Sequence, residues 1–331
     1  MKGSILAAAG VTLALALCSE LGVEARTAAC DRLCLEGFVD EYFEAMKFHH
    51  PERVPGASGA RYTENGVEIP AGQGLWGTFS DLGSYRIYAT DPQTAQAAFV
   101  GTIRENGTPA ILALRLRVVD GKLSEAEAIV HRAAADAGAL ESRGQPDAIW
   151  SQPVKAGIEP PHREQLVRAA RLYFRGILAA HGQLVPFSED CNRIIDGVQD
   201  TNNAADRGFL FGTYNPAGLS CPDNLSSGVW AYIESIQPQR YPLVDEEKGI
   251  VFAVLMFNHP GNITSAYARG YGRVPMPSVV LRPSTVEIAD FFKIEGGQIK
   301  RIEAVTTALP YMHPDGWSGK AGSANDRSFR P

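Results

Sequence analysis

Apolar residues recur along this chain with two spacings, and each spacing appears twice in the same order. Residues 38–46 and 172–178 place apolar side chains three or four positions apart, which predicts an amphipathic helix in each segment. A polar stretch ending in a glycine turn, at Gly66 and at Gly197, follows each helix and leads into long apolar strands joined by hairpin turns. A helix followed by a meander of long antiparallel strands predicts an α+β fold instead of parallel β-α-β units.

The two helix-and-strand patterns belong to an internal repeat. Three stretches of the first copy align in order on the second, at offsets of 131, 154 and 176 residues: 38–67 on 169–198, 86–91 on 240–245, and 113–129 on 289–305. The extra residues of the second copy fall around 200–227 and 261–283. A tandem duplication explains the preserved order, and long loops on one copy point to that copy as the place of a ligand site or an interface.

The ends and the middle of the chain are expected to lie outside the repeat. Lys2 and the apolar run 5–17 are followed by a small-residue cleavage site at Ala25, which predicts a signal peptide and an exported, periplasmic or extracellular protein. The expected organisation is a signal peptide over 1–25, a first unit over 26–132, a linker over 133–160, a second unit over 161–318 and a flexible tail over 319–331. No later segment is long and apolar enough to predict a transmembrane helix.

Charge and cysteine content narrow the class of protein. A formal net charge of −6 and a pI near 5.7, with no basic stripe, argue against nucleic acid as a partner. Without the signal peptide four cysteines remain, and an even number in an oxidising compartment predicts disulfides. Cys30 with Cys34 and Cys191 with Cys221 are the simplest of three connectivities. Zinc is a poorer alternative, because the spacing fits no standard zinc finger.

Several motifs resemble those of the nuclear transport factor 2-like, or SnoaL-like, superfamily. They are the first helix of each copy, the Glu-Asn-Gly turn at 64–66 and the closing strand pair at 292–304. More narrowly, residues 240–249, 257–261 and 310–317 resemble a secreted bacterial and fungal family of unassigned function. The superfamily implies a cone-shaped unit, in which a strongly curved antiparallel sheet wraps around long helices and a pocket. Its members include cofactor-free isomerases, dehydratases and lyases as well as binding and structural modules, so the resemblance does not decide between enzyme and binding protein.

The repeat exposes one candidate catalytic residue. In the first copy the apolar positions 112, 114, 116 and 118 share one strand face, because side chains alternate along a strand. Where the first copy has Leu114, the second has Asp290 on an otherwise apolar face. A carboxylate there is expected to be desolvated and to have a raised pKa suited to proton transfer. The alternative is a structural carboxylate paired with an arginine or a helix-end amide.

Two further residues are candidates for proton transfer. His259 ends the apolar run 250–257 beside an inserted loop, where it can act as a general acid or base near neutral pH; a structural histidine at a turn is the alternative. Tyr232 is the second candidate for a proton donor or hydrogen-bond partner of Asp290.

The candidate substrate-binding residues lie around the second copy. Arg240 can orient an anionic group with its two-pronged guanidinium, although its recurrence as Arg86 favours a strand-end ion pair or a turn cap. His313, past the last strand, can close the pocket or belong to a surface tail. Aromatic and rim residues that suit a flat or hydrophobic ligand, with ordinary core packing as their alternative, are Trp230, Tyr214, Tyr173 and Arg207.

Signals for other chemistries are absent. The chain has no G-x-S-x-G elbow, no phosphate-binding glycine loop and no H-E-x-x-H pair, so no metal and no other cofactor is expected. The first hypothesis is a cofactor-independent lyase, dehydratase or isomerase that uses Asp290 as base on a small, largely apolar or aromatic compound. The alternatives are a non-catalytic exported module that binds a ligand in the same pocket and a pair of domains that mainly forms homodimers.

Overall fold

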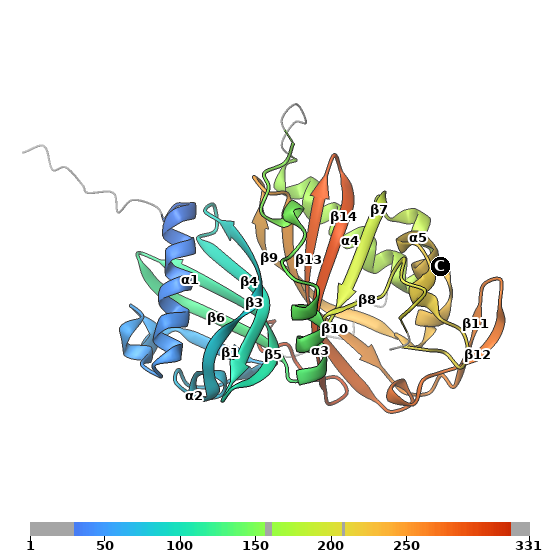
Figure 1. Ribbon diagram of the computed structural model, residues 1–331, viewed down its shortest axis with the longest axis horizontal. Helices are drawn as coiled ribbons and strands as arrows, with labels where there is room; N and C mark the ends of the chain where they lie inside the picture. Colours follow the sequence, from blue (N-terminus) through green and yellow to red (C-terminus); the bar gives the residue numbers. More distant parts are fainter. Residues whose placement is uncertain (1–29, 156–160, 207–208, 319–331) are drawn as a thin grey trace, which may run out of the picture.

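The computed structural model describes residues 30–155, 161–206 and 209–318, and it contains two β-rich units arranged side by side (Figure 1). The first unit consists of α1 (Arg32–Lys47), α2 (Leu75–Thr78) and the strands β1 (Arg61–Glu64), β2 (Val67–Glu68), β3 (Phe79–Asp91), β4 (Gln96–Glu105), β5 (Thr108–Val119) and β6 (Lys122–His131). The second consists of α4 (Arg163–Leu178), α5 (Cys221–Ser226) and the strands β7 (Phe187–Ile195), β8 (Val198–Gln199), β9 (Ser235–Asp245), β10 (Ile250–His259), β11 (Ser265–Ala268), β12 (Gly272–Pro275), β13 (Ser284–Glu295) and β14 (Gln298–Leu309). The predicted α+β class with two units is confirmed. The predicted signal peptide and the predicted tail lie outside the described residues.

Each unit contains one six-stranded sheet, and the two sheets have the same strand order. The order is β2-β1-β6-β5-β4-β3 in the first and β8-β7-β14-β13-β10-β9 in the second, with one parallel pair in each, β1 with β6 and β7 with β14. Both sheets are open, because the strands at their two edges do not pair with each other. The strand β11 pairs only with β12, in the second of the two predicted insertions.

The repeat extends to individual hydrogen bonds. The Asn65 side-chain oxygen accepts a hydrogen bond from the Val130 amide at 2.8 Å, and the Asp196 carboxylate accepts one from the Thr306 amide at 2.7 Å. These two contacts are related by the same offsets, 131 and 176, that align the two sequence copies. In both units these hydrogen bonds fix the turn after the first strand to the strand that comes last in the sequence of that unit.

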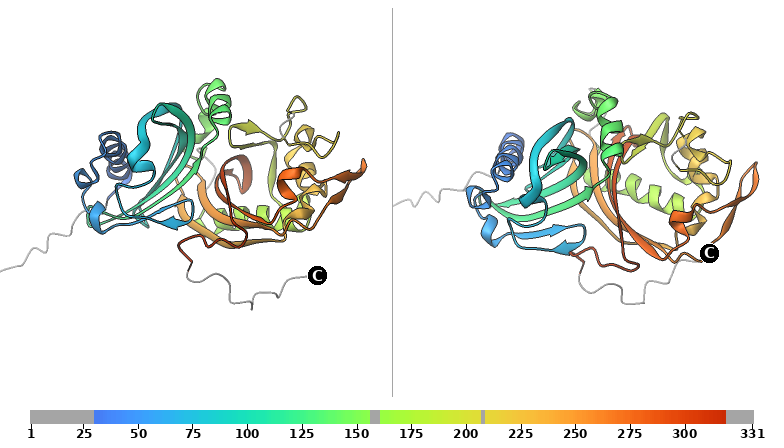
Figure 2. Two further views of the ribbon diagram at one scale, coloured as in Figure 1. Left: turned by 90° about the horizontal axis from the view of Figure 1, so that it is seen from below. Right: turned by 60° about the horizontal axis from the view of Figure 1, so that its bottom comes forward.

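The two faces of each sheet pack against different partners. Along β13, Ile288 and Phe292 face the core that contains α4, whereas Ala289 and Phe291 lie in a core between the two sheets. This alternation is the period-two pattern of a strand buried on both sides. The sheets therefore face each other between α1 on one side and α4 on the other (Figure 2).

Reciprocal ion pairs join the units across this junction. Arg32 at the start of α1 binds Asp245 of the second unit at 2.7 Å, and Arg163 at the start of α4 binds Asp91 of the first unit at 2.5 Å. The Asp245 carboxylate also accepts a hydrogen bond from the Thr90 amide, and the Asp91 carboxylate accepts one from the Val244 amide. Both contacts recur under the repeat offsets, so the two units are related by an approximate two-fold axis.

The segments that follow the two sheets cross between the units. The predicted linker includes a helix, α3 (Ala134–Ser142), which buries Ala137 and Leu140 in the core between the sheets. After β14 the chain continues onto the first unit, where the Trp317 indole N–H donates to Thr63 at 2.8 Å. Both crossing segments therefore help to hold the two sheets together.

The described part of the chain contains two disulfides, Cys30–Cys34 and Cys191–Cys221. They are the two local pairs that the sequence favoured. The second joins β7 to α5, which lies in the first insertion. Within the described ranges, no helix has the length and apolar character needed to cross a membrane.

Candidate functional site

Asp290 lies inside the second unit, on the face of β13 that turns toward α4. It is 3 % exposed, and no hydrogen bond joins its carboxylate to another described residue. Burial raises its pKa from 3.8 to about 7, and the nearby Arg193 guanidinium opposes part of this shift. The sequence-based expectation of an inward-facing carboxylate with a raised pKa is thus met by the geometry and the electrostatics.

The strand neighbours of Asp290 are smaller than those of its counterpart in the first unit. Asp290 pairs with Ala253 on β10 and with Ala304 on β14. The matching Leu114 pairs with Phe99, which occupies the position equivalent to Ala253. A leucine and a phenylalanine of the first core are therefore replaced by a carboxylate and a methyl group.

An ion pair between a buried arginine and a partly buried aspartate lies near Asp290. Arg193 on β7 is almost fully buried, and its guanidinium binds both oxygens of Asp200 at 2.6 to 3.1 Å. It also donates to the Tyr173 hydroxyl at 3.0 Å and to the Asn224 side-chain oxygen at 2.9 Å. A buried guanidinium with this many acceptors is a rigid, charge-compensated group.

The first unit has no such pair at the same place. The Asp200 amide donates to the Arg193 carbonyl, as the Ile69 amide donates to the Tyr62 carbonyl. Arg193 and Asp200 therefore replace Tyr62 and Ile69. Sequence analysis missed both residues, although the ungapped alignment already places Arg193 opposite Tyr62, and such a charged-for-apolar exchange was the available signal.

Several predicted residues gather around this polar interior. Tyr173 lies on α4, and burial raises its pKa, so its phenol stays protonated at neutral pH. The Trp230 ring packs against the Arg193 guanidinium at 5.4 Å, and the Trp230 N–H donates to Asn224. Tyr232 is buried next to them, at 6.1 Å between its ring centre and that of Trp230.

His259 and Asp290 are not brought together. His259 pairs with Ser284 on β13, six positions along the strand pair from the pairing of Ala253 with Asp290, which corresponds to about 20 Å. The His259 ring instead packs edge-on against Tyr232 at 4.9 Å. Burial lowers the pKa of His259 to about 4, and its Nε2 has no hydrogen-bond partner among the described residues, so the imidazole is neutral.

Three other predicted binding residues lie away from Asp290, and a fourth is not among the described residues. Arg240 faces the first unit, where it binds Glu127 and also Asp315 at 2.6 Å, so it forms the ion pair that was the alternative interpretation. His313 lies next to Gly66 of the first unit and does not close a pocket in the second. Tyr214 packs on Tyr271 at 4.9 Å, near β11 and β12. Arg207 lies outside the described residues.

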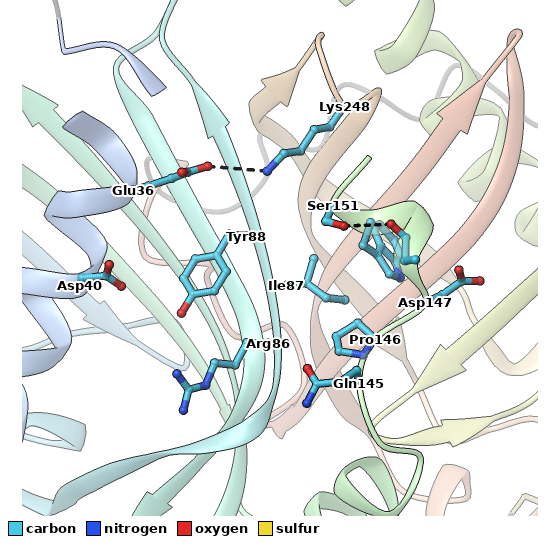
Figure 3. A pocket seen from close by; sticks show the side chains of 12 residues that line it. Glu36, Asp40, Arg86, Ile87, Tyr88, Gln145, Pro146, Asp147, Ser151 and Lys248 are labelled. Atoms are coloured by element: carbon cyan, nitrogen blue, oxygen red, sulfur yellow. Dashed lines mark hydrogen bonds and ion pairs between the residues drawn. The ribbon is translucent and has the colours of Figure 1, made fainter. Parts of the chain in front are cut away.

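Two cavities occur at the junction, and Asp290 lines neither. The first, of about 510 Å³, lies between α1 and β3 on one side and the segment after α3 on the other. Figure 3 shows Lys248 reaching toward Glu36 across it, with 3.6 Å between nitrogen and oxygen. The second, of about 220 Å³, is lined by Glu303, Tyr85 and residues of β7 and β14. Trp150 borders both cavities.

Metal ligands do not cluster in the described part of the chain. No group of three or more His, Cys, Asp or Glu side chains there is arranged to hold an ion. The polar groups described near the Asp290 carboxylate are the Arg193 guanidinium and the Tyr173 phenol.

Comparison with known proteins adds a family of unknown function. Residues 159–306 match a family model described as "Domain of unknown function (DUF8021)", a stretch that runs from just before α4 into β14 and covers less than half of the chain. No curated protein matches. A solved structure entitled "Crystal structure of a de novo designed protein with curved beta-sheet" is 10 % identical with a TM-score of 0.24, over 44 % of this chain and 88 % of that chain. A similarity this low supports no structural or functional argument.

Proposed function

We propose that the second unit is an acid/base site and that the protein is an exported, cofactor-independent lyase, dehydratase or isomerase. The substrate is a small, largely apolar or aromatic compound. The single observation that carries the proposal is Asp290, a buried carboxylate with a pKa near 7 and no hydrogen-bond partner among the described residues. A buried carboxylate without a partner costs folding free energy, and such groups are frequent at functional sites.

The groups around Asp290 suit proton transfer. A carboxylate with a pKa near neutrality can take a proton from the substrate and return it within one cycle. Arg193 lies within electrostatic range of Asp290 and can stabilise negative charge that develops on the substrate. Tyr173, held by Arg193 at 3.0 Å, replaces His259 as the proposed proton donor, because His259 lies too far along β10.

Kinship with the nuclear transport factor 2-like superfamily is part of the same proposal. The supporting features are a helix packed on one face of a six-stranded sheet in each unit and the strand order shared by the two. On this view the interior of the superfamily's cone corresponds to the core between α4 and the inner face of β10, β13 and β14.

A binding protein without turnover is the second candidate. The observation that favours it is the position of the two cavities, which lie at the junction of the units and away from Asp290. Its ligand would contact residues of both units and would need no proton transfer.

The test is a screen of the purified protein against small aromatic and aliphatic alcohols and carbonyl compounds, with thermal shift for binding and mass spectrometry for turnover. For a converted compound, Asp290→Asn is expected to reduce kcat by at least about 100-fold while the thermal shift persists. The control is Glu189→Gln, an exposed carboxylate on β7, which should leave turnover unchanged. Full turnover in Asp290→Asn would exclude the acid/base role, and binding without turnover in the unaltered protein would favour the second candidate.

A further inference from the structure

Glu127 and Glu303 occupy the same position in the two units, yet their surroundings differ. They lie on β6 and β14, are related by the offset of 176, and both point into the junction between the sheets. Both are nearly fully buried, with 1 % and 2 % of their surface exposed. The approximate two-fold axis therefore allows one site to be compared with the other.

Two guanidinium groups bind the Glu127 carboxylate. Arg115 donates to it at 2.8 Å from the neighbouring strand β5. Arg240 reaches it from the second unit with two nitrogens, one of them at 3.2 Å. The Trp317 ring stacks over Arg115 and Arg240, at 4.6 and 5.9 Å from the guanidinium carbons. A carboxylate, two guanidinium groups and an aromatic ring thus form a closed site.

The Glu303 carboxylate has no guanidinium bound to it. The strand neighbour that corresponds to Arg115 is Phe291. Arg86 corresponds in sequence to Arg240. The strand partner of Arg86 is Gly101, which lies one position away from the residue that corresponds to the strand partner of Arg240. A shift of one residue turns a side chain to the other face of a strand, and the Arg86 side chain donates to the Gly83 carbonyl instead.

Only one hydrogen bond reaches Glu303 from the described residues. The Tyr85 hydroxyl donates to its Oε2 at 3.1 Å, and the other oxygen has no partner there. In place of the missing guanidinium the structure has the cavity of about 220 Å³, with Glu303, Tyr85 and Trp150 along its wall. At roughly 30 Å³ per water molecule, this volume suits a small metabolite and not a drug-sized ligand.

The rim of this cavity supplies the opposite charge. Arg143 donates to the Gln199 side chain at 3.0 Å, and no carboxylate of the described residues lies within ion-pair distance of it. Arg301, also on the rim, is already bound by Asp147 at 2.8 Å. The cavity therefore has a carboxylate without a cation at its buried end and a guanidinium without an anion at its open end.

We propose that this cavity binds a small guanidino acid, with its guanidinium on Glu303 and its carboxylate on Arg143. The guanidinium takes the place that Arg240 has on Glu127 in the other half of the same molecule. A guanidinium can donate two parallel hydrogen bonds to a carboxylate. The indole of Trp150 is an aromatic wall against which the planar group can pack. This site is separate from Asp290, so it stands or falls independently of the proposed acid/base function.

Binding is coupled to the ionisation of Glu303. Burial raises the pKa of Glu303 to about 8 in the empty site, with Tyr85 and Arg143 favouring the charged form to a smaller extent. The other charged groups lining the cavity are Asp147 and Arg301, which are paired with each other. A bound guanidinium requires the ionised carboxylate, so binding below pH 8 releases a proton. Affinity is therefore expected to rise about tenfold from pH 6 to pH 7 and to level off above pH 8.

The test is isothermal titration of the full mature chain with 4-guanidinobutanoate at pH 6, 7 and 8. Agmatine, which has an ammonium in place of the carboxylate, and butanoate, which has no guanidinium, are the comparison ligands. We expect saturable binding of 4-guanidinobutanoate that tightens with pH, weaker binding of agmatine and none of butanoate. Glu303→Gln should weaken 4-guanidinobutanoate at least tenfold and abolish its pH dependence.

A second variant, on the open rim of the cavity, tests the proposal even if Glu303→Gln fails to fold. Arg143→Met should weaken 4-guanidinobutanoate but not agmatine, whose ammonium no longer faces a like charge, and Glu189→Gln should change neither. Absence of 4-guanidinobutanoate binding at all three pH values would overturn the proposal. Binding of butanoate that strengthens as the pH falls would overturn it as well, because it would identify an anion site with a protonated Glu303.

Discussion

Asp290 and Leu114 occupy equivalent positions in the two sheets, where one is a carboxylic acid and the other an apolar side chain. Leu114 packs in a closed apolar core. Asp290 is buried as deeply, opposite two alanines and without a hydrogen bond to the described chain. Burial without pairing favours the neutral acid, so the proton affinity of this residue is coupled to folding.

The first prediction concerns the pH dependence of stability. The pKa of Asp290 rises from 3.8 to about 7 on folding, so between these values the folded chain holds a proton that the unfolded chain has lost. The stability contribution is complete below pH 4 and is lost as the pH rises through 7, by up to about 4 kcal/mol. Urea titrations should therefore show Asp290→Asn gaining stability relative to the unaltered protein between pH 4 and pH 8.

The comparison with the first unit supplies the control for this prediction. Asp290→Leu installs the residue of the first unit and should likewise raise the free energy of unfolding at pH 8. The buried Glu303 and Asp196, whose pKa values are also raised, are present in all three proteins and cancel in the difference. A stability difference that stays constant from pH 4 to pH 8 would contradict the assigned pKa.

At the scale of elements, the polar interior depends on how the first insertion is anchored. Asn224, which binds Arg193, lies on α5 (Cys221–Ser226), and the Cys191–Cys221 disulfide fixes the start of this helix to β7. The insertion and the disulfide therefore position an acceptor for the buried guanidinium. The Cys30–Cys34 disulfide closes a loop of a few residues at the start of α1 and has no such contact.

The second prediction separates the two disulfides. By loop length alone, replacing both Cys191 and Cys221 by alanine should cost about 4 kcal/mol, and replacing Cys30 and Cys34 about 2 kcal/mol. The first loss should be accompanied by weaker ligand binding or turnover in the second unit, because α5 loses its anchor. Urea denaturation of the two double variants measures this, and equal midpoints would show that the longer loop has no special role.

At the scale of the whole molecule, each sheet packs one apolar face against the other sheet. Without this contact, both faces would be exposed to solvent. Ile87 and Val100 of the first sheet pack in one core with Phe252 and Phe291 of the second. The ion pairs made by Asp91 and Asp245 close this core on both sides of the two-fold axis. The two units of one chain therefore cover each other's apolar sheet faces.

The third prediction tests this closure. Asp91→Ala leaves the Val244 amide without its acceptor and leaves the Arg163 guanidinium with Gln93 but no carboxylate as its partner. This change should lower the free energy of unfolding by about 3 to 5 kcal/mol. Asp91→Asn keeps an acceptor for the amide but loses the charge, so it should cost less. Chemical denaturation of both variants measures the difference, and a loss below about 1 kcal/mol in Asp91→Ala would mean that the pair is only a surface contact.

The sequence by itself determined which residues point inward, because a strand alternates with period two and the two copies can be compared position by position. That comparison placed Asp290 on the inner face, favoured the two local disulfides and predicted two α+β units. It also contained the exchange of Tyr62 for Arg193, which points to the Arg193–Asp200 ion pair when polar replacements are compared along the whole alignment.

Only the tertiary structure decided what each face meets. Arg240 binds Glu127 because β9 packs against the first sheet. His313 lies on the first unit because the chain crosses to that unit after β14. The one-residue difference in strand register that separates Arg86 from Arg240 depends on local irregularities of β3 and β9, which residue identity does not encode. Periodicity specifies the direction of a side chain along its own strand, whereas its partner comes from a distant part of the chain that only packing brings near.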